Sequence, residues 1–477
     1  MNDFSNFYNK KIIIFCPHQD DEINIAGGII PCLLKNSCDV KIVYSTNGDY
    51  FCKKKYRYLE AINSLSVLGV KETNVYFLGY PDCFSSDNSH LYMSDKIWIS
   101  KKGNRLTSSY KNNDYHYLRY KKHNVINKEN FVNDIYDLIK FELPDILICV
   151  DFDSHADHRA LSLSFERALG ILIKELDNYR PLVFKTFAYP TSYVGYSDFK
   201  QYYLSETKFK KEKFNKYELQ NPYYNWDDRI KVKCCKASRN RILLFNKTFR
   251  AIMKHHSQFI INNTYSIINS DYVYFERFTD NLLLKSNIIT SSGCSSFLND
   301  FMYFDLSNIM HGNSEEPIFD LGKTVFEKSD KLCEVYIELE SKCNIDEIKV
   351  FQSVDSDCVI KKISILVGKE KVVFNVKEKN FCYVIRHANL VDINGFTLKI
   401  EEYDGENLAL TEIEAYENTK NYCKLQSNIK NNHIFSKNII EKVLFKIIFL
   451  IDDLTIFFCR VNNKFIRMYR NRFDKKE

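Results

Sequence analysis

Two short clusters of polar residues carry the side chains that could do chemistry. The first is His18-Gln19-Asp20-Asp21-Glu22 and the second is Asp151–His158, and each follows an apolar run typical of a buried strand. An open α/β sheet places its ligand site outside the carboxyl ends of its strands. If the two strands are near neighbours in one sheet, the clusters face each other across a single crevice.

Together the clusters supply the groups that a catalytic zinc site needs. Three His or Asp side chains can hold the ion while a fourth position stays open for water. A further carboxylate can take the proton of that water, and a further imidazole can stabilise developing charge. A site of two histidines and one carboxylate also suits iron and other first-row divalent metals. Either cluster alone would be more typical of a solvated turn or a helix cap.

The elements that position these clusters alternate between strand and helix patterns. Strands are predicted at residues 12–16, 40–45, 75–78 and 146–150, and helices at 21–34, 56–68, 131–141 and 158–176. This rhythm predicts an α/β domain over residues 1–285, Rossmann-like and three-layered, with a mainly parallel sheet. Residues 82–127 interrupt it. They are polar and without period, which predicts a long functional loop or an insertion.

The motifs resemble those of the PIG-L (LmbE-like) zinc-dependent de-N-acetylases over roughly residues 8–280. The family's His-Pro-Asp-Asp-Glu is similar to residues 18–22, and its His-Pro-Asp-His is similar to residues 155–158. Gln19 and Ala156 replace the two prolines, neither of which binds metal. Further likenesses follow in order at Thr46–Asp49, Arg57–Ala61, Leu68–Val70, Phe77–Asp82 and Lys254–Gln258.

The resemblance implies a zinc-dependent N-deacetylase, a hydrolase that acts on an N-acetylated amino sugar of the GlcNAc type. It would belong to a glycoconjugate or glycan biosynthesis pathway. The implied metal ligands are His18, Asp21 and His158. Two alternatives stay open: a zinc amidase acting on a non-sugar amide, and an inactive glycan-binding protein.

The resemblance also implies roles for the remaining polar residues of the clusters. Asp20 would be the general base, and His155 would polarise the acetamide carbonyl and stabilise the oxyanion. Asp157 would support the imidazole of His155. Arg57 would reach the substrate or back up the region of Glu22.

Aromatic and basic residues of the 82–127 insertion could line a sugar and phosphate site. An ordered surface insertion is an equally good interpretation, and Trp226 has the same two interpretations. The residues concerned in the insertion are Trp98, Tyr110, Tyr115, Tyr117, Arg119 and Tyr120.

Residues 286–420 change to short runs of alternating apolar and polar residues, which predict an all-β sandwich. Three stretches resemble the discoidin or galactose-binding-like family: Val335–Leu339, Asn344–Val350 and Leu410–Tyr416. Such domains often bind glycans, but a structural or dimerising role is at least as good an interpretation, because sandwiches share these patterns without sharing function.

Residues 421–477 form a basic tail whose apolar residues recur at helical spacing from Ile439 to Phe473. Lys446, Asp452 and Asp453 argue against a membrane span, because a carboxylate at the bilayer centre costs about 2.5–3.5 kcal/mol. A helix packed on the protein and a helix on a membrane surface, through residues 439–476, both stay open.

The net charge of +6 divides into +9 for residues 1–285, −10 for 286–420 and +7 for 421–477. A positive first domain suits an anionic sugar carrier, and the opposite signs of sandwich and tail favour a tail folded back on the sandwich. The weak total and the lack of a recognised binding fold argue against a nucleic-acid partner.

The fifteen cysteines are scattered singly except for Cys234 and Cys235, and the first residues hold no signal-peptide core. This pattern predicts mostly reduced thiols in a cytoplasmic protein, with peripheral contact at the inner face of the membrane if the tail binds lipid. The sequence predicts no oligomeric state.

Overall fold

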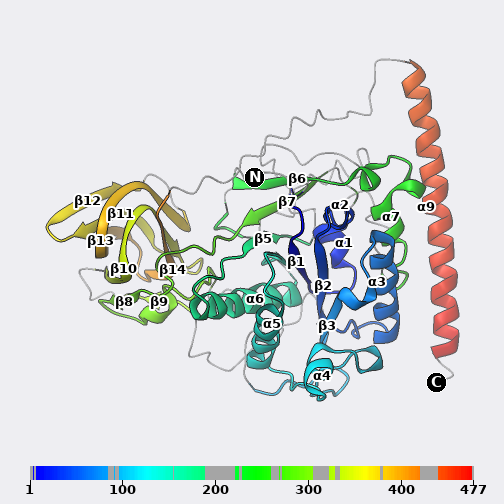
Figure 1. The fold of residues 1–477 in the computed structure, drawn as a ribbon, viewed down its shortest axis with the longest axis horizontal. Helices are drawn as coiled ribbons and strands as arrows, with labels where there is room; N and C mark the ends of the chain where they lie inside the picture. Colours follow the sequence, from blue (N-terminus) through cyan, green and yellow to red (C-terminus); the bar gives the residue numbers. More distant parts are fainter. Residues whose placement is uncertain are drawn as a thin grey trace.

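The computed structural model describes residues 4, 7–83, 91, 96–153, 155–188, 221–224, 228–258, 268, 271–304, 322–327, 333–376, 380–418 and 439–474. An N-terminal mixed sheet with helices is followed by an antiparallel all-β domain and one long C-terminal helix (Figure 1). This arrangement confirms the predicted fold class.

The first sheet has seven strands in the order β3-β2-β1-β4-β5-β7-β6. The strands β1 to β5 pair in parallel, and β7 pairs antiparallel with both β5 and β6. The order reverses direction at β1 and β4, which makes their carboxyl ends the topological switch point. The strands are β1 (Lys11–Cys16), β2 (Asp39–Thr46), β3 (Val75–Tyr80), β4 (Ile146–Val150), β5 (Leu182–Thr186), β6 (Ile230–Lys233) and β7 (Asp271–Glu276).

Figure 1 shows α5 and α6 on one side of this sheet and α1, α2 and α3 on the other. The helices are α1 (Asp21–Ala26), α2 (Ile30–Lys35), α3 (Lys54–Leu68), α4 (Tyr115–Tyr120), α5 (Lys128–Glu142), α6 (Ala156–Glu175) and α7 (Lys247–Ile252). Short 3-10 helices are η2 (Glu72–Asn74), η3 (Tyr110–Asn112), η7 (Lys236–Arg239), η8 (Leu243–Phe245) and η10 (Ser295–Phe297).

The single helix predicted over residues 21–34 is wrong, because the chain breaks between α1 and α2. Pro31 stands in the first turn of α2, where its missing N–H costs nothing, but it could not donate within a continuous helix. Gly28 sits in the break, where a side chain would collide with Cys234 and Tyr272. The spacing of apolar residues predicted the helical character of this segment but not the break between α1 and α2.

The second domain is one antiparallel sheet in the order β12-β11-β13-β10-β14-β9, with β8 paired to β10. Its two longest strands, β10 and β13, change register between Glu338 and Glu347, and such bulges bend a sheet. The strands are β8 (Asn287–Thr290), β9 (Thr324–Val325), β10 (Cys333–Gln352), β11 (Val359–Val367), β12 (Glu370–Asn375), β13 (Cys382–Asp404) and β14 (Ala409–Tyr416).

The described residues form two apolar cores, one centred on each domain. Phe351 of β10 and Cys382 of β13 belong to the first core, so the second domain packs against the first. A fully buried ion pair ties the two together: Arg277 follows β7 and donates to Glu414 of β14. Phe301 and Tyr303 lie against the Arg277 guanidinium, with ring centroids 3.8 and 3.7 Å away.

The C-terminal helix α9 (Ile439–Asp474) confirms the predicted helical tail, although residues 419–438 and 475–477 lie outside the described part. It packs beside η8 of the first domain. The net charges had favoured a tail folded back on the sandwich, and that expectation is wrong. Among the described residues, no helix has both the length and the apolar character needed to cross a bilayer.

One cysteine pair departs from the expected reduced thiols. Cys32 of α2 and Cys235 form a disulfide, with their Cα atoms 5.6 Å apart. Twelve further cysteines among the described residues are free.

Candidate metal centre

The two polar clusters meet at the switch point of the first sheet. Strand β1 leads into residues 17–22, and its parallel neighbour β4 leads into residues 151–158. Because both strands end at the same edge, the clusters face each other as the sequence predicts. His155 caps the N-terminus of α6, so the second cluster ends on the first turn of a 20-residue helix.

The structure brings the three predicted metal ligands into one triangle. His18 Nδ1 lies 3.1 Å from Asp21 Oδ2 and 3.3 Å from His158 Nε2, and His158 Nε2 lies 3.5 Å from Asp21 Oδ2. The exposed fraction of these side chains is 11% or less. All three atoms therefore converge on one small buried space.

The size of this triangle fits a metal ion. A tetrahedral ion with bonds of about 2.0–2.1 Å separates any two of its ligands by about 3.3 Å. The three observed separations, 3.1, 3.3 and 3.5 Å, lie around that value. The donor set of two imidazole nitrogens and one carboxylate oxygen suits zinc and other first-row metals.

Two carboxylates orient His18 from behind the triangle. His18 Nε2 lies 3.1 Å from Asp157 Oδ2 and 3.2 Å from Asp82 Oδ1. Donation from Nε2 leaves Nδ1 unprotonated toward the triangle, which is the tautomer that a metal requires. The sequence assigned no role to Asp82, although its position directly after β3, at the same edge of the sheet, was a usable signal.

His158 is oriented in the same way by Asp153. Its Nδ1 lies 2.7 Å from Asp153 Oδ2, and both side chains are buried. Nε2 is thereby left to face His18 and Asp21. Asp153 belongs to the predicted second cluster, but its partner could not be read from the sequence.

The carboxylates around the triangle shift the titration of the histidines. Burial lowers the pKa of His158, but Asp153 and Asp21 outweigh it and raise that pKa to about 9. Burial likewise opposes protonation of His18, and Asp82, Asp157 and Asp21 raise its pKa well above the usual range. Without a metal, the protons on His18 and His158 offset the negative charge of these carboxylates. A bound metal ion would take over that positive charge, so metal binding is expected to release the protons.

His155 lies beside the triangle, with its ring centroid 4.6 Å from that of His18 and 4.7 Å from that of His158. Burial and the neighbouring imidazoles lower its pKa, so it stays neutral. Its Nδ1 accepts a hydrogen bond from the backbone N–H of Asp157 at 3.2 Å, which places the ring proton on Nε2. The Asp157 carboxylate, expected to support His155, lies against His18 instead.

Other combinations of these side chains also bring ligand atoms within 4.8 Å of one another. One is His18, His155 and His158, and the other is His18, Asp82 and Asp157. All belong to one largely buried cluster whose ligand atoms could hold a metal ion.

Asp20 lies at the edge of the cluster and is held by Arg57. Arg57 Nη2 donates to Asp20 Oδ1 at 3.3 Å, and Arg57 Nε donates to Gln19 Oε1 at 3.4 Å. Burial raises the pKa of Asp20, an effect that the Arg57 charge opposes. Arg57 therefore orients Asp20 and Gln19, and it does not contact Glu22.

Glu22 turns away from the triangle and is held by other residues. His255 Nε2 lies 2.7 Å from Glu22 Oε1, and Ser64 Oγ donates to the same oxygen at 2.8 Å. Glu22 and His255 are fully buried. Ser257 of the predicted Ser-Gln pair bonds to Glu60 of α3, so the late motif braces the helices behind the metal cluster.

The described part of the 82–127 insertion is more regular than predicted, because it contains η3 and α4. Tyr115 and Arg119 contact Asp137 of α5, Tyr117 stacks on His123, and Arg119 lies against Tyr120. These contacts favour the interpretation of an ordered surface insertion. Trp226 lies outside the described residues.

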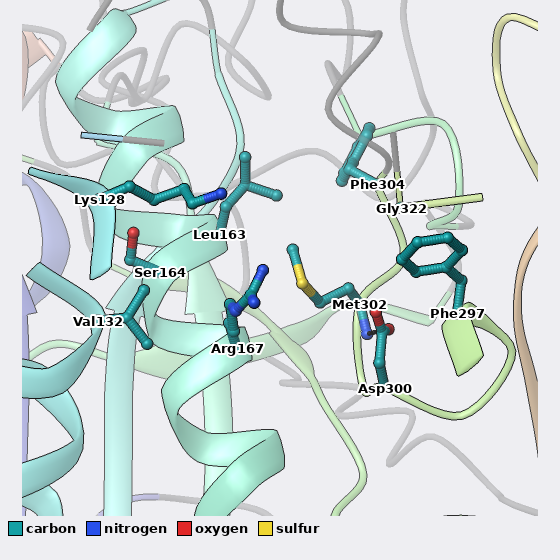
Figure 2. Close-up of a pocket in the computed structure, with 10 residues that line it drawn as sticks. All are labelled: Lys128, Val132, Leu163, Ser164, Arg167, Phe297, Asp300, Met302, Phe304 and Gly322. Atoms are coloured by element: carbon teal, nitrogen blue, oxygen red, sulfur yellow. Dashed lines mark hydrogen bonds between the residues drawn. The ribbon is translucent and has the colours of Figure 1, made fainter. Parts of the chain in front are cut away.

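A separate pocket lies between α5, α6 and the segment around residue 300 (Figure 2). Burial raises the pKa of Asp300, on its wall, to about 7. The pocket shares no residue with the metal cluster. It is lined by Lys128, Val132, Leu163, Ser164, Arg167, Phe297, Asp300, Met302, Phe304 and Gly322.

Comparison with known proteins confirms the predicted resemblance over the segment that carries both clusters. Residues 13–169 match the PIG-L family, described as GlcNAc-PI de-N-acetylase. No curated protein matches the chain.

Several solved structures are similar in part. One is N,N′-diacetylchitobiose deacetylase from Pyrococcus horikoshii, 21% identical over 36% of this chain and 52% of that chain, with a TM-score of 0.23. A fucose-binding module from Streptococcus pneumoniae is 15% identical over 29% of this chain and 97% of that module, with a TM-score of 0.23. A family 32 carbohydrate-binding module from C. perfringens, in complex with galactose, is 12% identical over 28% and 96%, with a TM-score of 0.22.

Proposed function

We propose that this protein is a zinc-dependent de-N-acetylase that hydrolyses the acetamide of a GlcNAc-type sugar to acetate and a free amine. The observation that carries the proposal is the triangle of His18 Nδ1, Asp21 Oδ2 and His158 Nε2, with edges of 3.1–3.5 Å. It lies within the residues that match the PIG-L family. The finer assignment to a glycan biosynthesis pathway is part of the proposal.

In this proposal His18, Asp21 and His158 hold the metal, and Asp153, Asp157 and Asp82 keep the two imidazoles in the binding tautomer. When bound, a divalent ion supplies a Lewis acid that acidifies water and polarises an amide carbonyl. Zinc is the proposed metal, although the same donor set suits other first-row divalent ions.

Asp20 is the proposed general base. Its carboxylate accepts the proton of the attacking water, whose oxygen bonds to the acetyl carbon. Arg57 holds the carboxylate at the edge of the cluster, so Asp20 needs no rearrangement before it reacts. When the carbon–nitrogen bond breaks, the amine takes the proton back from Asp20. The products are then acetate and the amino sugar, and Asp20 is ready for another cycle.

His155 is the proposed donor to the acetamide oxygen. Because its Nδ1 is engaged by the backbone N–H of Asp157, its proton is on Nε2. A neutral imidazole can donate one hydrogen bond from that atom to the oxyanion as it forms.

The test is acetate release from a panel of N-acetylhexosamine compounds by the full-length protein, with and without a chelator. We expect release that the chelator abolishes and added zinc restores. Asp20→Ala is expected to keep the metal and lose turnover, whereas His158→Ala is expected to lose both. No release from any sugar, with zinc confirmed in the protein, would refute the proposal.

Non-sugar acetamides added to the panel, together with a measurement of glycan binding, separate the remaining alternatives. Acetate release only from non-sugar amides would support an amidase, and glycan binding without release would support an inactive binding protein. Full activity of Asp20→Ala would refute the assignment of the base but leave the metal site standing.

A further inference from the structure

The last helix, α9, is held against the first domain by polar side chains. Asp452 Oδ1 accepts a hydrogen bond from the backbone N–H of Leu243 at 3.0 Å, and Asn463 Oδ1 lies 2.6 Å from His256 Nδ1. Arg467 donates to the carbonyl oxygens of His256 and Gln258 at 2.8 and 3.0 Å. The protein-facing side of α9 combines these polar contacts with the buried Ile456 and the partly buried Phe449 and Cys459, which pack against the first core.

The opposite side of α9 is apolar and exposed. The exposed fractions of its large side chains run from 39% to 65%. A helix on a globular protein normally turns most of its large apolar side chains to the core, whereas most of those on α9 are exposed. The side chains that define this outward stripe are Val443, Leu444, Ile447, Leu450, Ile451, Leu454, Phe457, Phe458, Phe465 and Met468.

The outward stripe is continuous along the helix. Val443, Ile447, Leu450, Leu454 and Phe458 follow each other at steps of three or four residues, which keeps them on one face. With a rise of 1.5 Å per residue, residues 443–468 span about 38 Å. The polar contacts of Asp452, Asn463 and Arg467 lie opposite this face, so they fix the stripe away from the protein.

Basic side chains border the outward stripe. Lys446, Arg460 and Lys464 are exposed. At 100° per residue they fall together on one edge of the stripe. Asp453 falls on the same edge and is the one exposed acidic side chain between residues 443 and 470, so this edge keeps an excess of two positive charges. This border complements a negatively charged surface and would repel its own copy in a paired helix.

We propose that α9 docks the protein on the surface of an anionic phospholipid bilayer. The helix lies in the plane of the interface, with the outward stripe among the upper acyl chains and the basic border at the phosphate headgroups. No described helix is able to span the bilayer, so contact stays at the surface. This inference is independent of the proposed catalytic function.

The first test is flotation of the full-length protein with phosphatidylcholine vesicles, prepared with and without phosphatidylglycerol. We expect the protein to float with the anionic vesicles. The triple variant Ile447→Gln, Leu454→Gln, Phe458→Gln should stay with the soluble fraction, because glutamine keeps the helix but removes the apolar stripe. A matched control changes three exposed apolar residues of the sandwich, Val372, Val373 and Val391, to glutamine and should float as the unchanged protein does.

A second variant tests the charges. Lys446→Gln, Arg460→Gln, Lys464→Gln should weaken binding to anionic vesicles by about fivefold per residue. Thermal unfolding of each variant confirms that the first domain remains folded.

Three results would overturn the proposal. The first is absence of the unchanged protein from the anionic vesicles, and the second is equal flotation of the stripe variant. The third is a dimer, seen by light scattering without lipid, that is lost in the stripe variant. In that last case a second copy of this chain covers the stripe.

Discussion

The contact between Asp153 and His158 predicts that metal affinity depends on a residue outside the triangle. Asp153 Oδ2 accepts from His158 Nδ1 at 2.7 Å, and Asp153 Oδ1 accepts from the backbone N–H of His155 at 2.8 Å. Both carboxylate oxygens are thus acceptors at fixed positions in a buried site. The substitution Asp153→Asn changes one of these acceptors into a donor at almost constant volume.

Neither orientation of the new amide suits metal binding. If its oxygen keeps the bond to His155, its NH₂ group faces His158 Nδ1 and moves the ring proton to Nε2, the atom that faces the triangle. If the amide is reversed, its NH₂ group meets the backbone N–H of His155, and two buried donors oppose each other. Loss of such a partner typically lowers metal affinity by 10–100-fold, or about 1.4–2.7 kcal/mol.

The assay is competition between the full-length protein and a chromophoric zinc chelator. We expect Asp153→Asn to lose about 10–100-fold in zinc affinity. Asp137→Asn is the matched control, because Asp137 is a carboxylate of the same domain that bonds to Tyr115 and Arg119. Thermal unfolding without metal shows whether both variants fold. A folded Asp153→Asn with unchanged zinc affinity would refute the inference that Asp153 sets the tautomer of His158.

Three further predictions concern the loop, the pocket and the domain contact. Gly48 has a φ of +68°, and a Cβ there would collide with Gln19 and lie 2.8 Å from Arg57 Cγ. Gly48→Ala should therefore displace Arg57 and the Asp20 that it holds, which lowers turnover while zinc affinity changes little. Turnover equal to that of the unchanged protein would contradict this. Burial raises the pKa of Asp300 to about 7, so the folded state keeps a proton that the unfolded chain releases near pH 4. The contribution of Asp300 to the free energy of unfolding therefore falls as the pH rises between about 4 and 7. The melting temperature of Asp300→Asn relative to the unchanged protein should therefore be higher at pH 8 than at pH 5, and an equal difference at both pH values would contradict the raised pKa. Glu414→Gln leaves the buried Arg277 charge without its partner and should lower the free energy of unfolding by about 3–5 kcal/mol. Asp392→Asn breaks the exposed pair with Lys342 and should lower it by under about 1 kcal/mol. Similar losses in the two variants would show that burial does not set the contribution of an ion pair to stability.

The sequence was sufficient to predict the parts of the site that depend on local order along the chain. Each polar cluster directly follows a buried strand, and parallel strands end at one edge, so their meeting could be foreseen. The carboxylates that orient His18 and His158 could not be singled out, because several carboxylates follow strands at that edge. The position of Asp82 after β3 is compatible with the role but does not select it. Only the three-dimensional path after β3 brings Asp82 to His18, and only the turn after β4 gives Asp153 to His158.

The difference between local sequence order and three-dimensional contacts also explains which features of the helices were predicted correctly. An apolar periodicity gives the exposed and buried sides of a helix only if the buried side is the apolar one, and it does not record an interruption. The break between α1 and α2 was therefore missed at Pro31. For α9 the extent was predicted correctly, but most of its large apolar side chains are exposed.

The position of α9 also shows why net charge was a poor guide to packing. The sandwich carries −10 and the tail +7, which favoured their association, yet α9 lies on the first domain, whose net charge is +9. Charges on exposed surfaces are screened within about 8–10 Å in physiological salt, so the sum over a domain acts weakly. Arg467 and Arg470 instead meet specific acceptors, the carbonyl oxygens of His256 and Gln258 and the carboxylate of Glu60. Those acceptors fix the rotation of α9 about its axis, and that rotation is what turns the outward stripe away from the protein.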